Sequence, residues 1–142
     1  MKGAYTIEKC GKDQIKTIVD GINDYNLRGV PEMADTWTAL EYAATDQNGN
    51  TIGGILGGIG YWNGLEIKIL WVAESHRKLG IGSALLDQME RVAKEKGAVI
   101  SMLDTFDFQA PDFYLSKGYS IIGRIDDFPP GHCRMYFSKK LT

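Results

Sequence analysis

The stretch Ser75-His76-Arg77-Lys78-Leu79-Gly80-Ile81-Gly82-Ser83 joins a strand-like apolar run to the longest helical pattern of the chain. The N-terminus of a helix carries unpaired N–H groups and about half a positive charge. Acidic or hydroxyl residues are typical there, yet three basic side chains precede this helix and two glycines follow them. Glycines let the backbone approach a phosphate, so the stretch predicts an anion site. A glycine loop with solvated surface cations is the other interpretation of the same residues.

The chain before this stretch has the pattern of an antiparallel meander. Strands are expected at Thr38–Thr45, Thr51–Trp62 and Leu65–Ala73. Asn63-Gly64 is a two-residue hairpin signal, because both residues tolerate positive φ. The glycines of the second strand predict a bulge or a close backbone approach. Trp71 alternates with Ile67 and Ile69, which indicates a core position for Trp71.

The chain after this stretch alternates between helical and strand patterns. An apolar stripe that begins at Ile81 predicts a helix that Gly97 ends, with Asp87→Arg91 and Glu90→Lys94 pairs on its outer face. Pro111 suits the first turn of a short helix that ends at Gly118. Further strands are expected at Ala98–Thr105, which should be buried on both faces, and at Tyr119–Ile125 and Cys133–Ser138. A strand, a long helix and another strand imply a parallel crossover.

The N-terminal third is less regular. A short strand is expected at Ala4–Glu8, and apolar residues at i, i+3 and i+4 predict an amphipathic helix over Lys12–Leu27. Gly29 and Pro31 end this helix. The segment Val30–Trp37 fits either a loop or a short helix.

Length and composition limit the protein to one domain over residues 1–142. The chain is 44% hydrophobic and 24% charged with a formal net charge of −2, so neither nucleic acid nor an anionic membrane is an expected partner. Cys10 and Cys133 lack metal-type spacing, which favours two free thiols in a reducing compartment. No signal peptide or membrane-spanning run is visible, so a cytoplasmic location is expected.

Two motifs carry a resemblance to a known family. Arg77-Lys78-Leu79-Gly80-Ile81-Gly82 fits the R/Q-x-x-G-x-G/A signature of the GNAT family of N-acetyltransferases. The run Ala110–Tyr119 looks like the A-x-x-F-Y-x-x-x-G-F/Y element of that family, and the elements between the two motifs follow its order. The resemblance covers residues 38–138 and, for the N-terminal third, the layout only. It implies an α/β fold with one mixed, mostly antiparallel sheet, helices on both faces and a splayed parallel strand pair.

Members of this family bind acetyl-CoA and move its acetyl group directly to an amine, so the resemblance implies acetyl-CoA as cosubstrate and no metal. The pyrophosphate would lie on the backbone N–H groups of residues 78–83, and the pantetheine arm would pair with the splayed strand. The Leu70 N–H would also polarise the thioester carbonyl. The implied cofactor-binding residues are Leu70, Val72, Arg77, Lys78, Leu79, Gly80, Ile81, Gly82 and Ser83.

Tyr114 falls on the general-acid tyrosine of the family, where a phenol could protonate the leaving thiolate. A core aromatic is the other interpretation. Glu66 falls where some relatives carry a general base, but it lies about 13 Å from Leu70 at about 3.3 Å per residue, so a water chain would be needed. A solvated Glu66–Lys68 pair is its alternative. Other candidate bases are Asp104, Asp107 and His132, the last of which also fits acceptor recognition.

No charge pattern names the acceptor. A polyamine, an amine drug, an amino acid and a protein amine all stay open, and so does a homodimer, since dimers are common in the family. Two other hypotheses remain. The domain could bind acyl-CoA without catalysis, as a sensor or an interaction module, or it could be an unrelated domain that holds a nucleotide at the helix start.

Overall fold

The computed structural model describes residues 3–142. Its contacts divide the chain into two compact units, Met1–Glu32 and Met33–Thr142. Residues 3–32 of the first unit contain one helix, α1, over Lys12–Gly29. The Gly11 N–H donates to the side-chain oxygen of Gln14 at 2.7 Å, which caps the start of this helix. Residues 4–8 form no strand, and no described strand pairs with them, so the predicted N-terminal strand is wrong.

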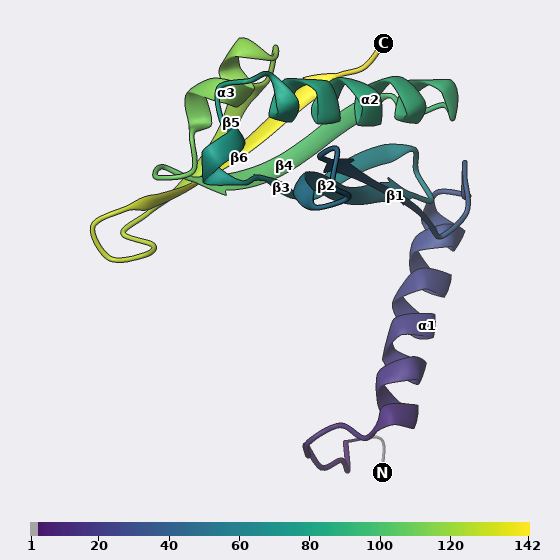
Figure 1. The fold of residues 1–142 in the computed structure, drawn as a ribbon. Coiled ribbons are helices and arrows are strands. Elements are labelled where there is room, and N and C mark those ends of the chain that lie inside the picture. Colours follow the sequence, from purple (N-terminus) through teal and green to yellow (C-terminus); the bar gives the residue numbers. More distant parts are fainter. Residues whose placement is uncertain (1–2) are drawn as a thin grey trace. The chain divides into compact units, whose positions relative to one another are not determined.

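The second unit is built on one six-stranded sheet with the order β1-β2-β3-β4-β6-β5 (Figure 1). Its strands are β1 (Trp37–Thr45), β2 (Thr51–Gly60), β3 (Gly64–Val72), β4 (Ile100–Phe106), β5 (Ser120–Asp126) and β6 (Cys133–Lys140). Only β3 and β4 are parallel, and every other neighbouring pair is antiparallel. The predicted mixed, mostly antiparallel sheet with a parallel crossover is confirmed. Residues 30–36 form a loop, the first of the two alternatives for that segment.

Helix α2 (Ile81–Glu95) makes the crossover between β3 and β4 and covers β1, β2 and β3. The 3₁₀ turn η1 (Glu74–His76) precedes it, and the short helix α3 (Pro111–Ser116) lies on the same side of the sheet (Figure 1). The apolar face of α2 is buried against the inner face of the sheet, with Leu86 and Met89 fully enclosed. A helix layer on the other face would have to come from α1, so that part of the expected architecture stays a prediction.

The turn between β2 and β3 differs from the predicted two-residue hairpin. The loop is Tyr61-Trp62-Asn63, closed by a hydrogen bond from the Asn63 N–H to the Gly60 carbonyl at 3.1 Å. Of these three loop residues and Gly64, only Asn63 has positive φ, at 61°. This is a three-residue loop that ends in a left-handed residue, a common hairpin connection with the same twist requirement.

A β-bulge in β3 changes which side chains face the core. Leu56 pairs with Ile69 and Gly57 pairs with Ile67, which leaves Lys68 as the extra residue. Before the bulge Ile67 is buried, but after it Ile69 is 54% exposed and Trp71 is 49% exposed. The predicted core position of Trp71 is therefore wrong, because alternation across a bulge does not keep one face.

Three further expectations are wrong, two of them because side chains of α2 bond to other elements and not to the partners that sequence spacing predicts. Glu90 is buried and bonds to Tyr119 and Lys139 rather than to Lys94. Asp87 pairs with Lys117 rather than with Arg91. Strand β4 alternates instead of being buried on both faces, and its Asp104 side chain is exposed.

Candidate active site

Strands β3 and β4 separate along their length. They pair only at Gly64–Glu66 with Ile100–Met102, and no pairing continues toward the carboxyl ends of the strands. A cavity of about 410 Å³ lies in the opening and is lined by residues 67–72 of β3 and 103–105 of β4 among others. The predicted splayed parallel pair is therefore present. Backbone groups of β3 that would pair with a neighbouring strand face this opening instead.

The first turn of α2 lies at the end of the same opening. Gly80 precedes the helix with a φ of +83°, and Lys78 also has positive φ, at 65°. The first hydrogen bond of the helix runs from the Ala84 N–H to the Gly80 carbonyl at 3.0 Å. Within residues 3–142 the N–H groups of residues 81–83 have no hydrogen-bond partner. These adjacent donors at the positive end of a helix dipole form a site for an oxyanion.

A second cavity, of about 490 Å³, lies against this turn. The predicted cofactor-binding residues line it except for Leu79, which is largely exposed: Leu70, Val72, Arg77, Lys78, Gly80, Ile81, Gly82 and Ser83. Leu70, Val72, Arg77 and Tyr114 line both cavities, so the two cavities adjoin, and together they are called the cleft below. The Arg77 Nε–H donates to the Val72 carbonyl at 3.1 Å, which fixes this guanidinium at the junction between strand and helix.

Tyr114 lies on α3 where the two cavities meet. Its ring packs edge-on against Phe113 at 5.2 Å and near Phe137 at 5.8 Å, and the side chain is 8% exposed. Burial raises the pKa of the Tyr114 phenol above its usual 10.0. No described residue forms a hydrogen bond with its hydroxyl. The Tyr114 ring belongs to the core, as one interpretation of the sequence has it, and the residue also lines both cavities, so its role as general acid stays a prediction.

Glu66 lines neither of the two cavities of this cleft. It is on β3 where that strand still pairs with β4, and it lines a third cavity of about 460 Å³. Lys68, its alternative ion-pair partner, lies over the Trp37 ring at 4.7 Å instead. Asp104 lines both this third cavity and the opening between the strands, but Arg134 donates two N–H groups to it at 3.0 and 2.9 Å. The structure thus brings neither carboxylate next to Tyr114 as a free base.

Two candidate bases, Asp107 and His132, lie within hydrogen-bond distance of each other, which the sequence did not predict. Nδ1 of His132 lies 3.1 Å from Oδ1 of Asp107, and the His132 ring packs edge-on against Phe108 at 5.2 Å. Phe108 lines the opening between the strands. The two residues are 25 positions apart, and their pairing depends on the β5–β6 loop, so no spacing signal could have found it.

The turn between β4 and α3 contains residues that sequence reasoning missed. The Gln109 side-chain oxygen accepts hydrogen bonds from the Phe106 N–H at 3.0 Å and the Thr105 hydroxyl at 3.2 Å. Ala110 follows in the left-handed region with a φ of 65°. Both line the two cavities of the cleft. The left-handed residue before Pro111 aims α3 so that Tyr114 reaches the cleft.

The described residues 3–142 also show the state of the cysteines, the acidic and histidine side chains and the helices. Cys10 and Cys133 are free thiols, as predicted. No group of three or more His, Cys, Asp or Glu side chains in that range could hold a metal ion. No helix in the same range is both long and apolar enough to cross a membrane.

Comparison with known proteins gives a consistent result. The model of the acetyltransferase (GNAT) family matches residues 16–119. A blasticidin-S acetyltransferase from Streptomyces morookaense is 39% identical over 109 residues, which are 74% of this chain and 78% of that relative. The crystal structure of an acetyltransferase from Bacillus cereus ATCC 14579 has a TM-score of 0.89 at 34% identity and covers 96% of this chain and 97% of its own.

A further solved structure includes the acetyl donor. A candidate streptothricin acetyltransferase from Bacillus anthracis str. Ames, in complex with acetyl coenzyme A, has a TM-score of 0.63 at 25% identity and covers 72% of this chain and 62% of its own. The chain belongs to the GNAT family of acetyltransferases. It is accordingly an N-acetyltransferase that depends on acetyl-CoA.

Proposed function

We propose that this enzyme transfers acetyl from acetyl-CoA to a primary amine of a small, cationic, antibiotic-like molecule. The observation that carries the choice of acceptor is the 39% identity, over 74% of the chain, to a blasticidin-S acetyltransferase. Local chemistry supports it. The opening between β3 and β4 is lined by the aromatic rings of Trp71 and Phe108, and aromatic faces attract an ammonium group.

The residues of the cleft fit the donor. The unpaired N–H groups of residues 81–83 suit a pyrophosphate, and Arg77 adds a positive charge at the same end. Gly82 leaves room there, since the nearest atoms to a Cβ on it would belong to Val72 and Phe113, at 3.7 Å or more. The open edge of β3 at Leu70 and Val72 offers backbone groups to the amides of the pantetheine arm. Acetyl-CoA, when bound, supplies an activated acyl group with a thiolate as leaving group.

Two groups of the chain would then act at the thioester. The Leu70 N–H donates to the carbonyl oxygen, which stabilises negative charge on it during attack by the amine. The Tyr114 hydroxyl donates its proton to the sulfur as the bond to carbon breaks. Burial raises the pKa of Tyr114, so this group keeps its proton at neutral pH. Direct transfer requires no covalent enzyme intermediate.

The acceptor must lose a proton before it attacks, because the pKa of an alkylammonium is about 10.4. We retain Glu66, acting through water, as the proposed base. The Asp107–His132 pair is the second candidate, since Asp107 fixes one ring nitrogen and leaves the other free to accept a proton. Replacement of each residue by Gln should separate the two. The variant that lacks the base should lose most of its kcat, and the other variant should keep it.

A thiol-release assay against a panel of amines tests the proposal. The panel contains blasticidin S, a streptothricin, an aminoglycoside, spermidine, free lysine and a lysine-containing peptide. We expect turnover with a cationic antibiotic at a kcat/KM at least about tenfold above that for the peptide. Turnover with the peptide alone would overturn the choice of acceptor. Tight binding of acetyl-CoA with no turnover on any amine would favour the non-catalytic sensor instead.

A further inference from the structure

We propose that Lys117 is a positioning residue of the cofactor site, which orients the Ser83 hydroxyl so that its proton points toward the cofactor's pyrophosphate. This inference rests on the proposed binding of that pyrophosphate at the start of α2. Lys117 does not line the cleft, whereas Ser83 does. Its influence on the cofactor must therefore pass through Ser83.

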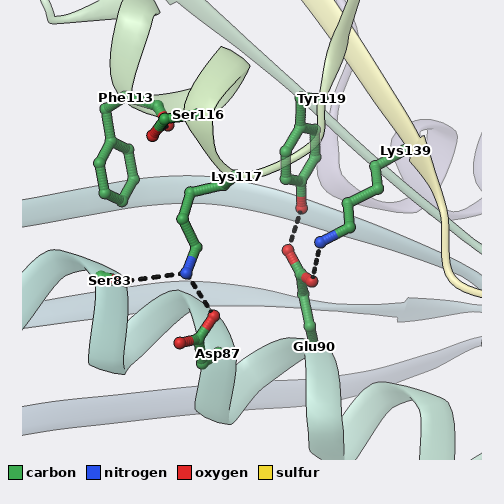
Figure 2. Close-up of polar contacts among 8 residues, drawn as sticks. All are labelled: Ser83, Asp87, Glu90, Phe113, Ser116, Lys117, Tyr119 and Lys139. Atoms are coloured by element: carbon green, nitrogen blue, oxygen red, sulfur yellow. Dashed lines mark hydrogen bonds and ion pairs between the residues drawn. The ribbon is translucent and has the colours of Figure 1, made fainter.

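The Lys117 ammonium is held in one place by two contacts on α2 (Figure 2). It donates to Ser83 Oγ at 2.8 Å and to Asp87 Oδ1 at 2.6 Å. Ser83 and Asp87 are four residues apart, so they lie one above the other on the same face of the helix. The Lys117 side chain is only 18% exposed, although the Asp87 side chain is 62% exposed. A lysine that bridges these two positions is largely buried and has little freedom to turn away.

The chemistry of the two groups fixes the direction of the Ser83 proton. An ammonium has three donors and no acceptor, so at Ser83 it can only occupy a lone pair of the hydroxyl oxygen. The hydroxyl proton must then point elsewhere, and no described residue accepts it. Ser83 lies beside the unpaired N–H groups of residues 81–83 and lines the same cavity. Its proton thus joins the donors available to a pyrophosphate oxygen.

The backbone around Lys117 is suited to this role. Lys117 is the residue at which α3 ends, and Gly118 follows in the left-handed region with a φ of +89°. The Lys117 N–H is bonded to the carbonyls of Phe113 and Tyr114 at 3.2 and 3.1 Å. The segment that carries the general-acid candidate Tyr114 also carries Lys117. The short helix α3 and the residue that caps its C-terminus therefore both lie at the proposed cofactor site.

A matched control lies on the same face of α2. Glu90, two turns beyond Ser83, accepts hydrogen bonds from Lys139 at 2.6 Å and from Tyr119 at 2.8 Å (Figure 2). Lys139 is also a mostly buried lysine paired with a carboxylate of this helix. Within residues 3–142 its ammonium pairs with Glu90 and lies 5.6 Å from the centre of the Tyr119 ring, and neither of these residues lines the cleft. Loss of Lys139 therefore perturbs a similar ion pair and leaves Ser83 untouched.

The test is calorimetric binding of CoA and of 3′-dephospho-CoA, which retains the pyrophosphate. Lys117→Met should weaken both ligands about tenfold, the worth of one charge-assisted hydrogen bond. Ser83→Ala should give the same loss, and the double variant should lose no more than either single one. Lys117→Arg, which keeps the charge and the donors, should restore most of the affinity, and Lys139→Met should leave it unchanged.

Several results would overturn the inference. Unchanged affinity of Lys117→Met removes the role, and additive losses in the double variant show that Lys117 does not act through Ser83. A loss with CoA but not with 3′-dephospho-CoA would assign Lys117 to the 3′-phosphate instead. An equal loss in Lys139→Met would show a general effect of loosening α2. Failure of the wild-type protein to bind CoA at all would remove the proposed function as well, and is seen before any variant is compared.

Discussion

At the scale of single residues, Tyr114 combines a buried ring with a hydroxyl that has no partner in the described chain. Tyr114→Phe removes the hydroxyl and keeps the ring, so packing against Phe113 and Phe137 should persist. We expect kcat to fall about 100-fold, the usual contribution of a general acid, with an unchanged dissociation constant for acetyl-CoA. Steady-state kinetics and calorimetry measure the two quantities. An unchanged kcat would leave Tyr114 with its core role alone.

The pH dependence gives a second prediction at this residue. Burial raises the pKa of Tyr114, and a raised pKa means that the protonated, donating form persists to higher pH. The alkaline fall in kcat that belongs to Tyr114 should therefore lie above the 10.0 of an unperturbed tyrosine. A pH profile of the wild type and of Tyr114→Phe measures this. A wild-type midpoint below 10.0 that vanishes in the variant would contradict the raised pKa.

Gly82 permits a substitution that separates binding from stability. A Cβ at Gly82 would meet Val72 and Phe113 at ordinary contact distances, so Gly82→Ala should fold normally. Gly82→Asp adds a carboxylate beside the unpaired N–H groups of α2, which stabilises a helix start. We expect a melting temperature equal to or above that of Gly82→Ala, together with a loss of CoA affinity of more than about 100-fold. Near-normal affinity of Gly82→Asp would move the pyrophosphate away from this turn.

At the scale of elements, the close approach of β2 to β3 depends on glycines at positions where the backbone of β3 leaves no room for a side chain. A Cβ on Gly57 would lie 2.3 Å from the Glu66 carbonyl oxygen, whereas a Cβ on Gly60 would meet nothing within 4 Å. Gly57→Ala must therefore push the two strands apart at the bulge. We expect a loss of about 2–3 kcal/mol in the free energy of unfolding, against less than about 1 kcal/mol for Gly60→Ala. Urea denaturation of the two variants measures the difference.

The same elements show what local sequence could and could not predict. The start of α2 was predictable because glycines, cations and a helical stripe lie next to one another in the chain. The bulge at Lys68 was not, since alternation over Ile67, Ile69 and Trp71 looks the same with or without an extra residue. The position of the hairpin at Asn63 was predicted, but the number of residues in its loop was not, because Asn63 and Gly64 are compatible with more than one type of turn.

Most other features that the sequence did not predict depend on contacts between segments that are distant in the chain. The Ser83–Lys117 contact joins residues 34 positions apart, and the Asp107–His132 pair joins residues 25 apart. No periodicity links such residues, and the predicted i, i+4 partners of Asp87 and Glu90 were wrong because these side chains meet other elements. The family resemblance supplied the proposed roles of Leu70 and Tyr114, which spacing alone did not predict.

At the scale of the whole molecule, a ligand that binds only the folded state raises its stability by mass action. Acetyl-CoA would contact two elements at once, the open edge of β3 and the start of α2, which are joined in the second unit by η1. We therefore expect CoA and acetyl-CoA to raise the melting temperature, with about 2.7 kcal/mol of stabilisation at 100 times the dissociation constant. ATP carries phosphates but no pantetheine arm to pair with β3, so an equal concentration should give a much smaller shift. Thermal unfolding with each ligand measures these shifts. Stabilisation by ATP without stabilisation by CoA would mean that the cleft between β3 and β4 holds a nucleotide. The proposed placement of the acetyl donor would then be wrong.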